Sequence, residues 1–304
     1  PYGLAPALVL SATAFAIAAT SFIFDSGTII RLGALQDGFS SLLAGPGNPA
    51  AQGQVVNFAR ALAGSLNTLS GTYAAQRQNA QDAVVADVST LNATLLGIGA
   101  LSDRIVKLQA LGTSTADIES QRDGAVNELS QLIDVKALVQ GNGDMILLTG
   151  SGLSLPTRVG QAQFTAAGAV LSAAAYHPGG AVPGVMLGGT DITAQPVGGR
   201  VGANLQLRDA TLPTFQAELD EFSQNLATRF DAQGLRLFSD PNGNIAAGGG
   251  VPAQAGYVGF AGTIGVTVAA LTPPSFPLQP VAASNAAAAP PRNVSCSAPA
   301  SGTR

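Results

Sequence analysis

The chain has 304 residues, of which 46% are hydrophobic and 5% aromatic, and it carries a formal net charge of −4 with a sequence pI of about 4.9. Two lysines stand beside twelve arginines, which leaves no basic stripe for a phosphate backbone and excludes nucleic acid as a partner. The single cysteine, Cys296, excludes a disulfide framework and a thiolate metal site, and the shortage of aromatic residues argues against a small-molecule substrate or a cofactor.

Residues 1–25 form an apolar leader. The run from Leu4 to Phe24 carries no charged residue and is about long enough to cross the hydrocarbon core of a membrane. No methionine and no basic segment precedes the run, as a signal peptide would require. A membrane segment and a truncated or misread gene end stay open as alternatives, and we do not expect a membrane partner.

Residues 26–133 are expected to form the first part of a helical domain. Apolar residues recur at steps of three and four over residues 49–111, which predicts one helix of about 90 Å that packs along a narrow apolar seam. Glycines inside this pattern cost about 1 kcal/mol each relative to alanine and mark places where the helix can bend. They are Gly64, Gly71, Gly97 and Gly99.

A second helix is predicted after Ser114, which with Asp117 resembles a capping box in which Asp replaces Glu. The helix is expected to end near Asp134. Its stretch is dense in acids for a chain that is 11% charged. We interpret the acids as a solvated helix face and not as a catalytic pair, because no nucleophile or metal ligand accompanies them.

Residues 134–197 are predicted to form a small antiparallel β domain inserted between helices. The segments VKALVQ and MILLTG flank a turn that contains Asn142 and Gly143, a combination typical of a β-hairpin. Residues 151–197 are rich in Gly, Ala and Pro and are expected to form short strands and loops. The single histidine, His177, is expected to be a surface residue without the partners of a catalytic triad or a zinc site.

The helical domain is expected to resume over residues 198–235, where apolar residues again keep the three-four spacing. Pro213 lies inside this pattern, and a proline removes a backbone donor and clashes with the preceding turn. We therefore expect either a kink there or a new helix start capped by Asp209 or Thr211.

Residues 236–304 are predicted to hold a loop, one short strand and a disordered tail. No acidic residue occurs beyond Asp240, and nine of the eighteen prolines fall there, which is typical of a segment without a packed core. The exception is GYVGFAGTIGV, residues 256–266, which is expected to contain the strand.

Two arginines occupy the apolar faces of predicted helices. Arg122 and Arg208 are each followed by an acid, Asp123 and Asp209 respectively. Adjacent residues on a helix point about 100° apart, so we expect that these neighbours do not satisfy one another. We predict that each arginine pairs with an acid on a facing helix, such as Asp209, Asp123 or Glu119, and fixes the register of the bundle. No catalytic, cofactor-binding or metal-binding residue is predicted.

Three segments, in order, resemble the flagellar hook-associated protein family of the hook-filament junction, FlgK. LQDGFSSLLAGPGNPAAQGQVVNFARALAGSLNTLS is similar to that family's succession of a short helix, an NP turn and a long helix. DIESQRDGAVNELSQLIDVKALVQGNGDMILLTGSG is similar to its QRD…ELS helix leading into a hairpin, and GGRVGANLQLRDATLPTFQAELDEFSQNLATRFDAQG is similar to its GG…RD..LP helix. The resemblance covers residues 31–266.

The resemblance, with the patterns above, implies an α+β fold: an elongated bundle of long α-helices with an inserted small antiparallel β domain and a disordered C-terminal tail. It implies a structural subunit that is not an enzyme, lies outside the cell at the hook-filament junction, and forms a ring with copies of itself. Its partners would be the hook protein and the second junction protein. The family's terminal helices are not recognisable, so the resemblance implies a fragmentary member.

A second interpretation of the function stays open. If residues 4–24 are a transmembrane helix, the chain is a membrane-anchored extracytoplasmic helical sensor or a coiled-coil binding module. An enzyme would need a constellation of catalytic residues that the sequence does not show.

Overall fold

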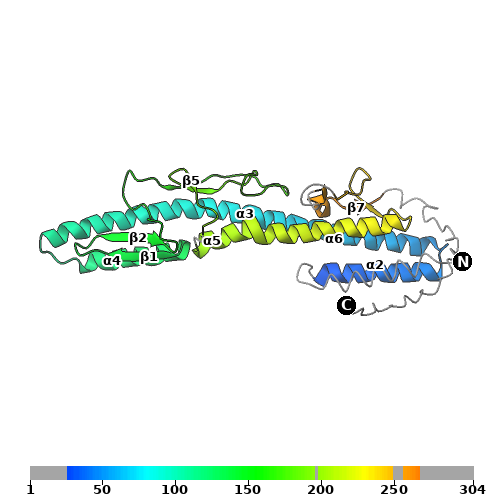
Figure 1. Ribbon diagram of the computed structural model, residues 1–304. Helices are drawn as coiled ribbons and strands as arrows, with labels where there is room; N and C mark the ends of the chain where they lie inside the picture. The colour runs from blue at the N-terminus through cyan, green and yellow to red at the C-terminus, as the bar shows by residue number, and fades with distance from the viewer. Residues whose placement is uncertain (1–25, 196–197, 249–255, 268–304) are drawn as a thin grey trace, which may run out of the picture.

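Figure 1 shows the computed structural model, an elongated rod in which helices far apart in the sequence lie side by side. The structure describes residues 26–195, 198–248 and 256–267. The predicted leader and most of the predicted tail lie outside these residues. The expected α+β architecture of long helices with small antiparallel sheets is confirmed.

The rod is built around α3, Pro49–Ala110, a continuous helix of 62 residues. Its N-cap, Asn48, accepts a hydrogen bond from the Ala50 amide at 2.9 Å, and a proline occupies the first turn, which gives the helix a defined start. At the other end Gly112 adopts a φ of 67°, and the next amide donates to a carbonyl of the last turn. The glycines inside α3 do not interrupt it.

One end of the rod consists of α2, Ser26–Ala44, packed with α3 and with α6, Leu212–Ala232. The apolar faces of these helices form the first hydrophobic cluster, together with the segment that carries β6, η3 and β7. The fully buried side chains of this cluster include Val55, Leu62, Leu66, Leu219 and Phe238.

The predicted strand in residues 256–266 is present but short. The segment contains the 3-10 turn η3, Phe260–Gly262, and ends in the strand β7, Gly265–Val266, which pairs antiparallel with β6, Phe238–Ser239. Most of this segment is therefore a turn that packs on the helices, and only its end is a strand.

The opposite end of the rod is formed by α3, α4 (Ala116–Leu132), a β-hairpin and α5 (Gly199–Gln206), which share the second hydrophobic cluster. The helix α4 begins later than the predicted capping box requires. Its N-cap is Thr115, which has helical φ and ψ angles, and the Thr115 hydroxyl donates to Glu119 Oε1 at 2.7 Å instead of capping a backbone amide. The predicted capping box is wrong for this reason.

The β insertion contains the predicted hairpin and a second small sheet. Strands β1, Val135–Val139, and β2, Met145–Thr149, pair antiparallel around the Asn142–Gly143 turn, so that prediction is confirmed. The second sheet has the strand order β3-β4-β5 and is antiparallel throughout. Its strands are β3 (Phe164–Ala166), β4 (Val185–Leu187) and β5 (Thr190–Asp191).

The last helix does not start anew with a side-chain cap, and its irregularity lies directly before Pro213. Between α5 and α6 the chain forms a π-helical turn, η1, Leu207–Thr211, and Pro213 occupies the first turn of α6. Thr211 has helical backbone angles and makes no capping bond. The predicted caps are wrong because the π-turn carries the helix continuously into α6, as Figure 1 shows.

Candidate functional site

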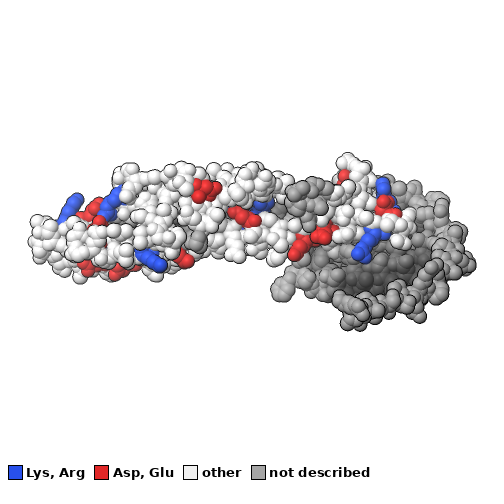
Figure 2. Space-filling view, in the orientation of Figure 1, with Lys and Arg blue, Asp and Glu red and all other residues white. Residues whose placement is uncertain are grey.

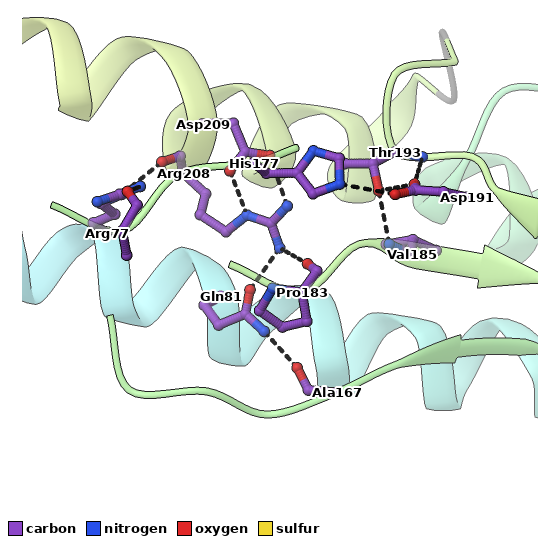
Figure 3. A network of polar contacts seen from close by, with 11 residues as sticks. Arg77, Gln81, Ala167, His177, Pro183, Val185, Asp191, Thr193, Arg208 and Asp209 are labelled. Carbon is purple, nitrogen blue, oxygen red and sulfur yellow. Dashed lines mark hydrogen bonds and ion pairs between the residues drawn. The ribbon is translucent and has the colours of Figure 1, made fainter. Parts of the chain in front are cut away.

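A polar waist separates the two hydrophobic clusters midway along α3. The fully buried α3 side chains of the first cluster end at Leu66, and those of the second begin at Val84. Between them, polar side chains of α3 face the π-turn η1 (Figure 3). We define the polar waist as Arg77, Gln81, Arg208 and Asp209.

Arg208 is fully buried and binds three partners at once. Its Nε and Nη2 donate to the two carboxylate oxygens of Asp209 at 2.8 and 2.6 Å. Its Nη1 donates to Gln81 Oε1 at 2.6 Å and to the Pro183 carbonyl at 3.1 Å. Bidentate arginine–carboxylate contacts are among the strong hydrogen bonds of proteins. One guanidinium therefore joins α3, the π-turn and the β insertion.

We expected that Arg208 and Asp209 do not form hydrogen bonds with each other, because they are adjacent in the chain. This expectation is wrong. In the π-turn the Leu212 amide donates to the Leu207 carbonyl, five residues back, so the local geometry departs from the α-helix on which that expectation rests. The long arginine side chain folds back onto its neighbour's carboxylate. The role of this pair in fixing the register of the bundle stays a prediction.

The π-turn and Pro213 together leave the Arg208 carbonyl without a donor in its own helix. In an α-helix this carbonyl would accept from the Leu212 amide, which is bonded to Leu207 instead. The following residue, Pro213, has no amide hydrogen. A buried carbonyl without a partner is unfavourable, so another element must supply the donor.

Arg77 of α3 supplies that donor. Its Nε donates to the Arg208 carbonyl at 2.8 Å, and its Nη1 and Nη2 donate to the Ser172 and Ala175 carbonyls at 3.2 and 2.6 Å. Burial lowers the pKa of the Arg77 guanidinium, the Asp209 carboxylate acts in the opposite direction, and Arg208 lowers the pKa further. The polar waist thus contains two guanidinium groups and one carboxylate.

Arg122 has a main-chain partner where the sequence predicts an acid. Its side chain is 3% exposed, its Nη1 donates to the Gly143 carbonyl at 2.7 Å, and its Nε has no hydrogen-bond partner within the described part of the chain. Asp123 is exposed on α4, and Glu119 accepts from Thr115. The predicted acid partner of Arg122 is wrong, because the hairpin turn occupies the place where a facing helix would supply a carboxylate.

The interpretation of the other acids around α4 as a solvated face is confirmed. Figure 2 shows acidic side chains along the α4 end of the rod, with some basic side chains among them on a mostly uncharged face. The exposed acids of this region are Asp117, Asp123, Glu128 and Asp134.

An ion pair between α3 and α5 was not predicted from the sequence. Arg200 Nε donates to both carboxylate oxygens of Asp87 at 2.9 and 3.0 Å, and its Nη2 donates to Oδ1 at 2.6 Å. The Asp87 side chain is 8% exposed and that of Arg200 is 57% exposed. The partners are 113 residues apart in the chain, so no local pattern could have paired them.

Asp220 of α6 is a buried acid that the sequence analysis also missed. Its carboxylate accepts from the Gly259 and Ala261 amides at 2.7 and 2.9 Å and from Gln216 Nε2 at 2.9 Å. Burial raises the pKa of the Asp220 carboxyl, although these hydrogen bonds act to lower it. Asp220 therefore holds the η3 turn on α6 through main-chain amides.

His177 is largely buried, which corrects the expectation of a surface residue. Its side chain is 11% exposed, and its Nε2 lies 2.9 Å from Asp191 Oδ2, because the loop that carries it folds back onto β5. The Thr193 hydroxyl and amide also donate to Asp191, at 2.6 and 2.9 Å. These two bonds, followed by the contact with His177, lower the pKa of Asp191 to about 2. A hollow of about 630 Å³ is lined by His177, Thr193 and Asp209, among others.

Asp191 and Asp220 are expected to give opposite dependences of stability on pH. The pKa of Asp191 lies below its ordinary value of 3.8, so its stabilising contribution is complete above that value and is lost as the pH falls toward about 2. The pKa of Asp220 lies above 3.8, so its contribution is complete below that value and is lost as the pH rises through the raised pKa. Urea unfolding of the wild type, Asp191→Asn and Asp220→Asn across this range measures both effects.

The stability difference between the wild type and Asp191→Asn should increase with pH, whereas the difference for Asp220→Asn should decrease. Two differences that change in the same direction would contradict the assignment of these environments.

Two further observations concern metal ions and membranes. Within residues 26–195, 198–248 and 256–267, no group of three or more His, Cys, Asp or Glu side chains is placed to hold a metal ion. Of the described helices, α3 alone is long and apolar enough to cross a membrane, and 39% of its most apolar window is buried in the structure. The core helix of a soluble protein meets the same criterion, so this observation is weak evidence for a membrane span.

Comparisons with known proteins identify a relative of this fold. A family model described as the flagellar hook-associated protein FlgK helical domain matches residues 25–245. The structure is similar to that of the flagellar hook junction protein FlgK from Burkholderia pseudomallei, with a TM-score of 0.55 and 23% sequence identity. The match covers 78% of this chain and 43% of that chain, so this chain spans less than half the length of the Burkholderia protein. No curated protein sequence matches the chain.

Proposed function

The chain belongs to the FlgK helical-domain family of flagellar hook-associated proteins, and we propose from this membership that it is a structural subunit at the hook-filament junction. The resemblance inferred from the three sequence segments is thereby confirmed. The observation that carries the proposal is the match to this family over residues 25–245. The family is a structural one, and we propose that the chain acts by packing and not as an enzyme.

The construction of the rod supports a structural role. Its buried charged groups bind other parts of the same chain: Arg208 binds α3 and the β insertion, Arg77 binds the π-turn, and Asp220 binds the η3 turn. Buried charges that are paired and hydrogen-bonded within a fold hold its elements in one arrangement. Such an arrangement suits a subunit whose shape must be reproduced in every copy of an assembly.

We further propose the location and the partners of the subunit. The chain would lie outside the cell, form a ring with copies of itself, and contact the hook protein and the second junction protein. Residues 134–197 would be an insertion into one helical unit made of residues 26–133 and 198–235. Arg208 with Asp209 would fix the alignment of the helices, and Arg122 would hold the hairpin on α4.

A pull-down experiment tests the proposed partners. The bait is this chain extended by the terminal segments of a longer family member, because it covers 43% of the Burkholderia protein. We expect the extended chain to retain the hook protein or the second junction protein from purified mixtures, whereas an unrelated coiled-coil rod of similar length retains neither. Failure to retain either protein, together with recovery of the full chain in the membrane fraction after carbonate washing, would favour the membrane-anchored alternative.

A further inference from the structure

A segment of the β insertion that begins as the strand β3 and ends in a turn at residues 173–174 lies along α3 in the middle of the rod. We define this segment, residues 164–175, as the strap, and the α3 side chains that bind it as the ladder. The members of the ladder are Arg77, Gln78, Gln81 and Asn92.

Two side-chain amides of the ladder bind the strap as a neighbouring strand would. Asn92 Nδ2 donates to the Phe164 carbonyl at 2.8 Å, and Asn92 Oδ1 accepts from the Phe164 amide at 3.1 Å. Gln78 Nε2 donates to the Ala169 carbonyl at 2.9 Å, and Gln78 Oε1 accepts from the Leu171 amide at 2.9 Å. A carboxamide carries the same donor and acceptor groups as a peptide unit, so each one takes the place of a strand residue.

The other two ladder residues also bind main-chain groups. Gln81 Nε2 donates to the Ala167 carbonyl at 2.7 Å, and Arg77 donates to the Ser172 and Ala175 carbonyls. Gln81 uses its remaining oxygen to accept from Arg208, so the ladder is continuous with the polar waist (Figure 3).

The spacing of the ladder matches an extended chain. Gln78 and Asn92 are fourteen residues apart, which is close to four helical turns, so they lie on one face of α3 about 21 Å apart. Their main-chain partners run from Phe164 to Leu171, seven residue steps that span about 23 Å in extended conformation. No side chain from residue 165 to residue 174 is fully buried, and of these only Ala166 packs against the second hydrophobic cluster, so most of the strap is held by its main chain.

We propose that the ladder is a binding site for extended polypeptide main chain, which recognises carbonyl and amide groups instead of side chains. The strap occupies this site as an intramolecular ligand, and the part beyond β3, residues 167–174, can lift from α3 while Phe164 stays in the second hydrophobic cluster and β3 stays paired with β4. The buried residues that anchor it, Phe164 and Ala175, lie only at its ends. A segment held by hydrogen bonds with few apolar contacts is expected to open locally at lower cost than the core.

Hydrogen exchange on the full chain tests whether the ladder holds the strap. Gln78→Glu and Asn92→Asp each replace the NH₂ donor by an oxygen that faces a strap carbonyl. We expect the amides of residues 164–175 to exchange about tenfold faster in these variants, with no change in α3 or α6. The matched controls are Gln76→Glu and Asn79→Asp, which make the same chemical changes at exposed positions of the same helix and should leave the strap unchanged.

Unchanged hydrogen exchange of the strap in Gln78→Glu and Asn92→Asp would overturn the proposal. An equal acceleration of exchange in the strap and in the helices would also overturn it, because the strap would then open only when the whole chain unfolds.

A second variant tests the preference for main chain. Residues 165–174 are reordered so that composition and length are kept but each position carries a different side chain. We expect strap exchange to remain within about twofold of the wild type, because the ladder bonds do not involve these side chains. A loss of protection with intact helical circular dichroism would show that side chains are read and would overturn the inference. The single changes Val170→Ser and Leu171→Ala provide the same comparison if the reordered chain does not fold.

Discussion

Replacing Arg208 by methionine is expected to lower the free energy of unfolding by about 3–5 kcal/mol, the range found when one partner of a buried ion pair is removed. Arg208 is completely buried, with a relative exposure of 0%. Methionine fills similar space, so the loss arises mainly from the carboxylate of Asp209 and the Gln81 oxygen that lose their donor. Urea unfolding followed by circular dichroism measures the change.

The control for Arg208→Met is Arg236→Met. Arg236 also pairs with a nearby carboxylate, that of Asp231, but its side chain is 53% exposed, and exposed pairs contribute little. We expect this control to leave the unfolding midpoint almost unchanged. Equal effects at the two arginines would contradict the special role of the polar waist.

Adding Asp209→Asn to Arg208→Met should recover part of the lost stability, because the double variant no longer leaves the half-buried Asp209 carboxylate unpaired. This cycle also tests whether Arg208 and Asp209, two of the residues that the sequence analysis proposed as register elements, act together. A coupling energy below about 0.3–0.5 kcal/mol would show that the two residues act independently.

Gly99→Ala is expected to destabilise the chain by about 1–3 kcal/mol, the usual cost of overpacking. A Cβ atom at this position of α3 would lie 1.7 Å from the Thr157 carbonyl oxygen, and backbone cannot yield as a flexible side chain does. The segment must also stay close because Arg158 Nη1 donates to the Gly99 carbonyl at 2.8 Å. Thermal and urea unfolding measure the loss.

Gly97→Ala is the matched control and should act in the opposite direction. A Cβ atom at Gly97 would meet no atom within 4 Å, so alanine is expected to stabilise the helix by about 0.5–1 kcal/mol. A stabilising effect at both positions would show that the chain near Thr157 does not need to approach α3 closely.

We propose that the polar waist holds a rod with two apolar clusters in one arrangement. Leu, Ala and Val side chains on parallel faces can keep many contacts after a shift along the helix, because apolar packing is not directional. The hydrogen bonds of Arg77 and Arg208 are directional and connect specific atoms of α3, the π-turn and the β insertion. A shift of one turn would leave buried guanidinium and carboxylate groups unpaired, which is unfavourable.

The sequence by itself determined the elements whose signals are local. The three-four spacing of apolar residues predicted α3 as one long helix, and Asn142 with Gly143 predicted the hairpin turn. Periodicity also placed Arg122 and Arg208 on buried faces, and both are buried. These features depend on residues within a few positions of one another, so they can be predicted from the sequence alone.

Only the tertiary structure decided which groups the buried charges meet. Arg122 binds a hairpin carbonyl, Arg208 binds its own neighbour, and Asp87 pairs with Arg200 across 113 residues. The spacing of apolar residues did not indicate the π-turn before Pro213. This turn takes the Arg208 carbonyl out of the α-helical hydrogen-bond pattern and makes it available to Arg77. The physical reason is that hydrogen-bond partners depend on atomic positions set by the packing of distant segments, and helical periodicity defines only which face of a helix is buried.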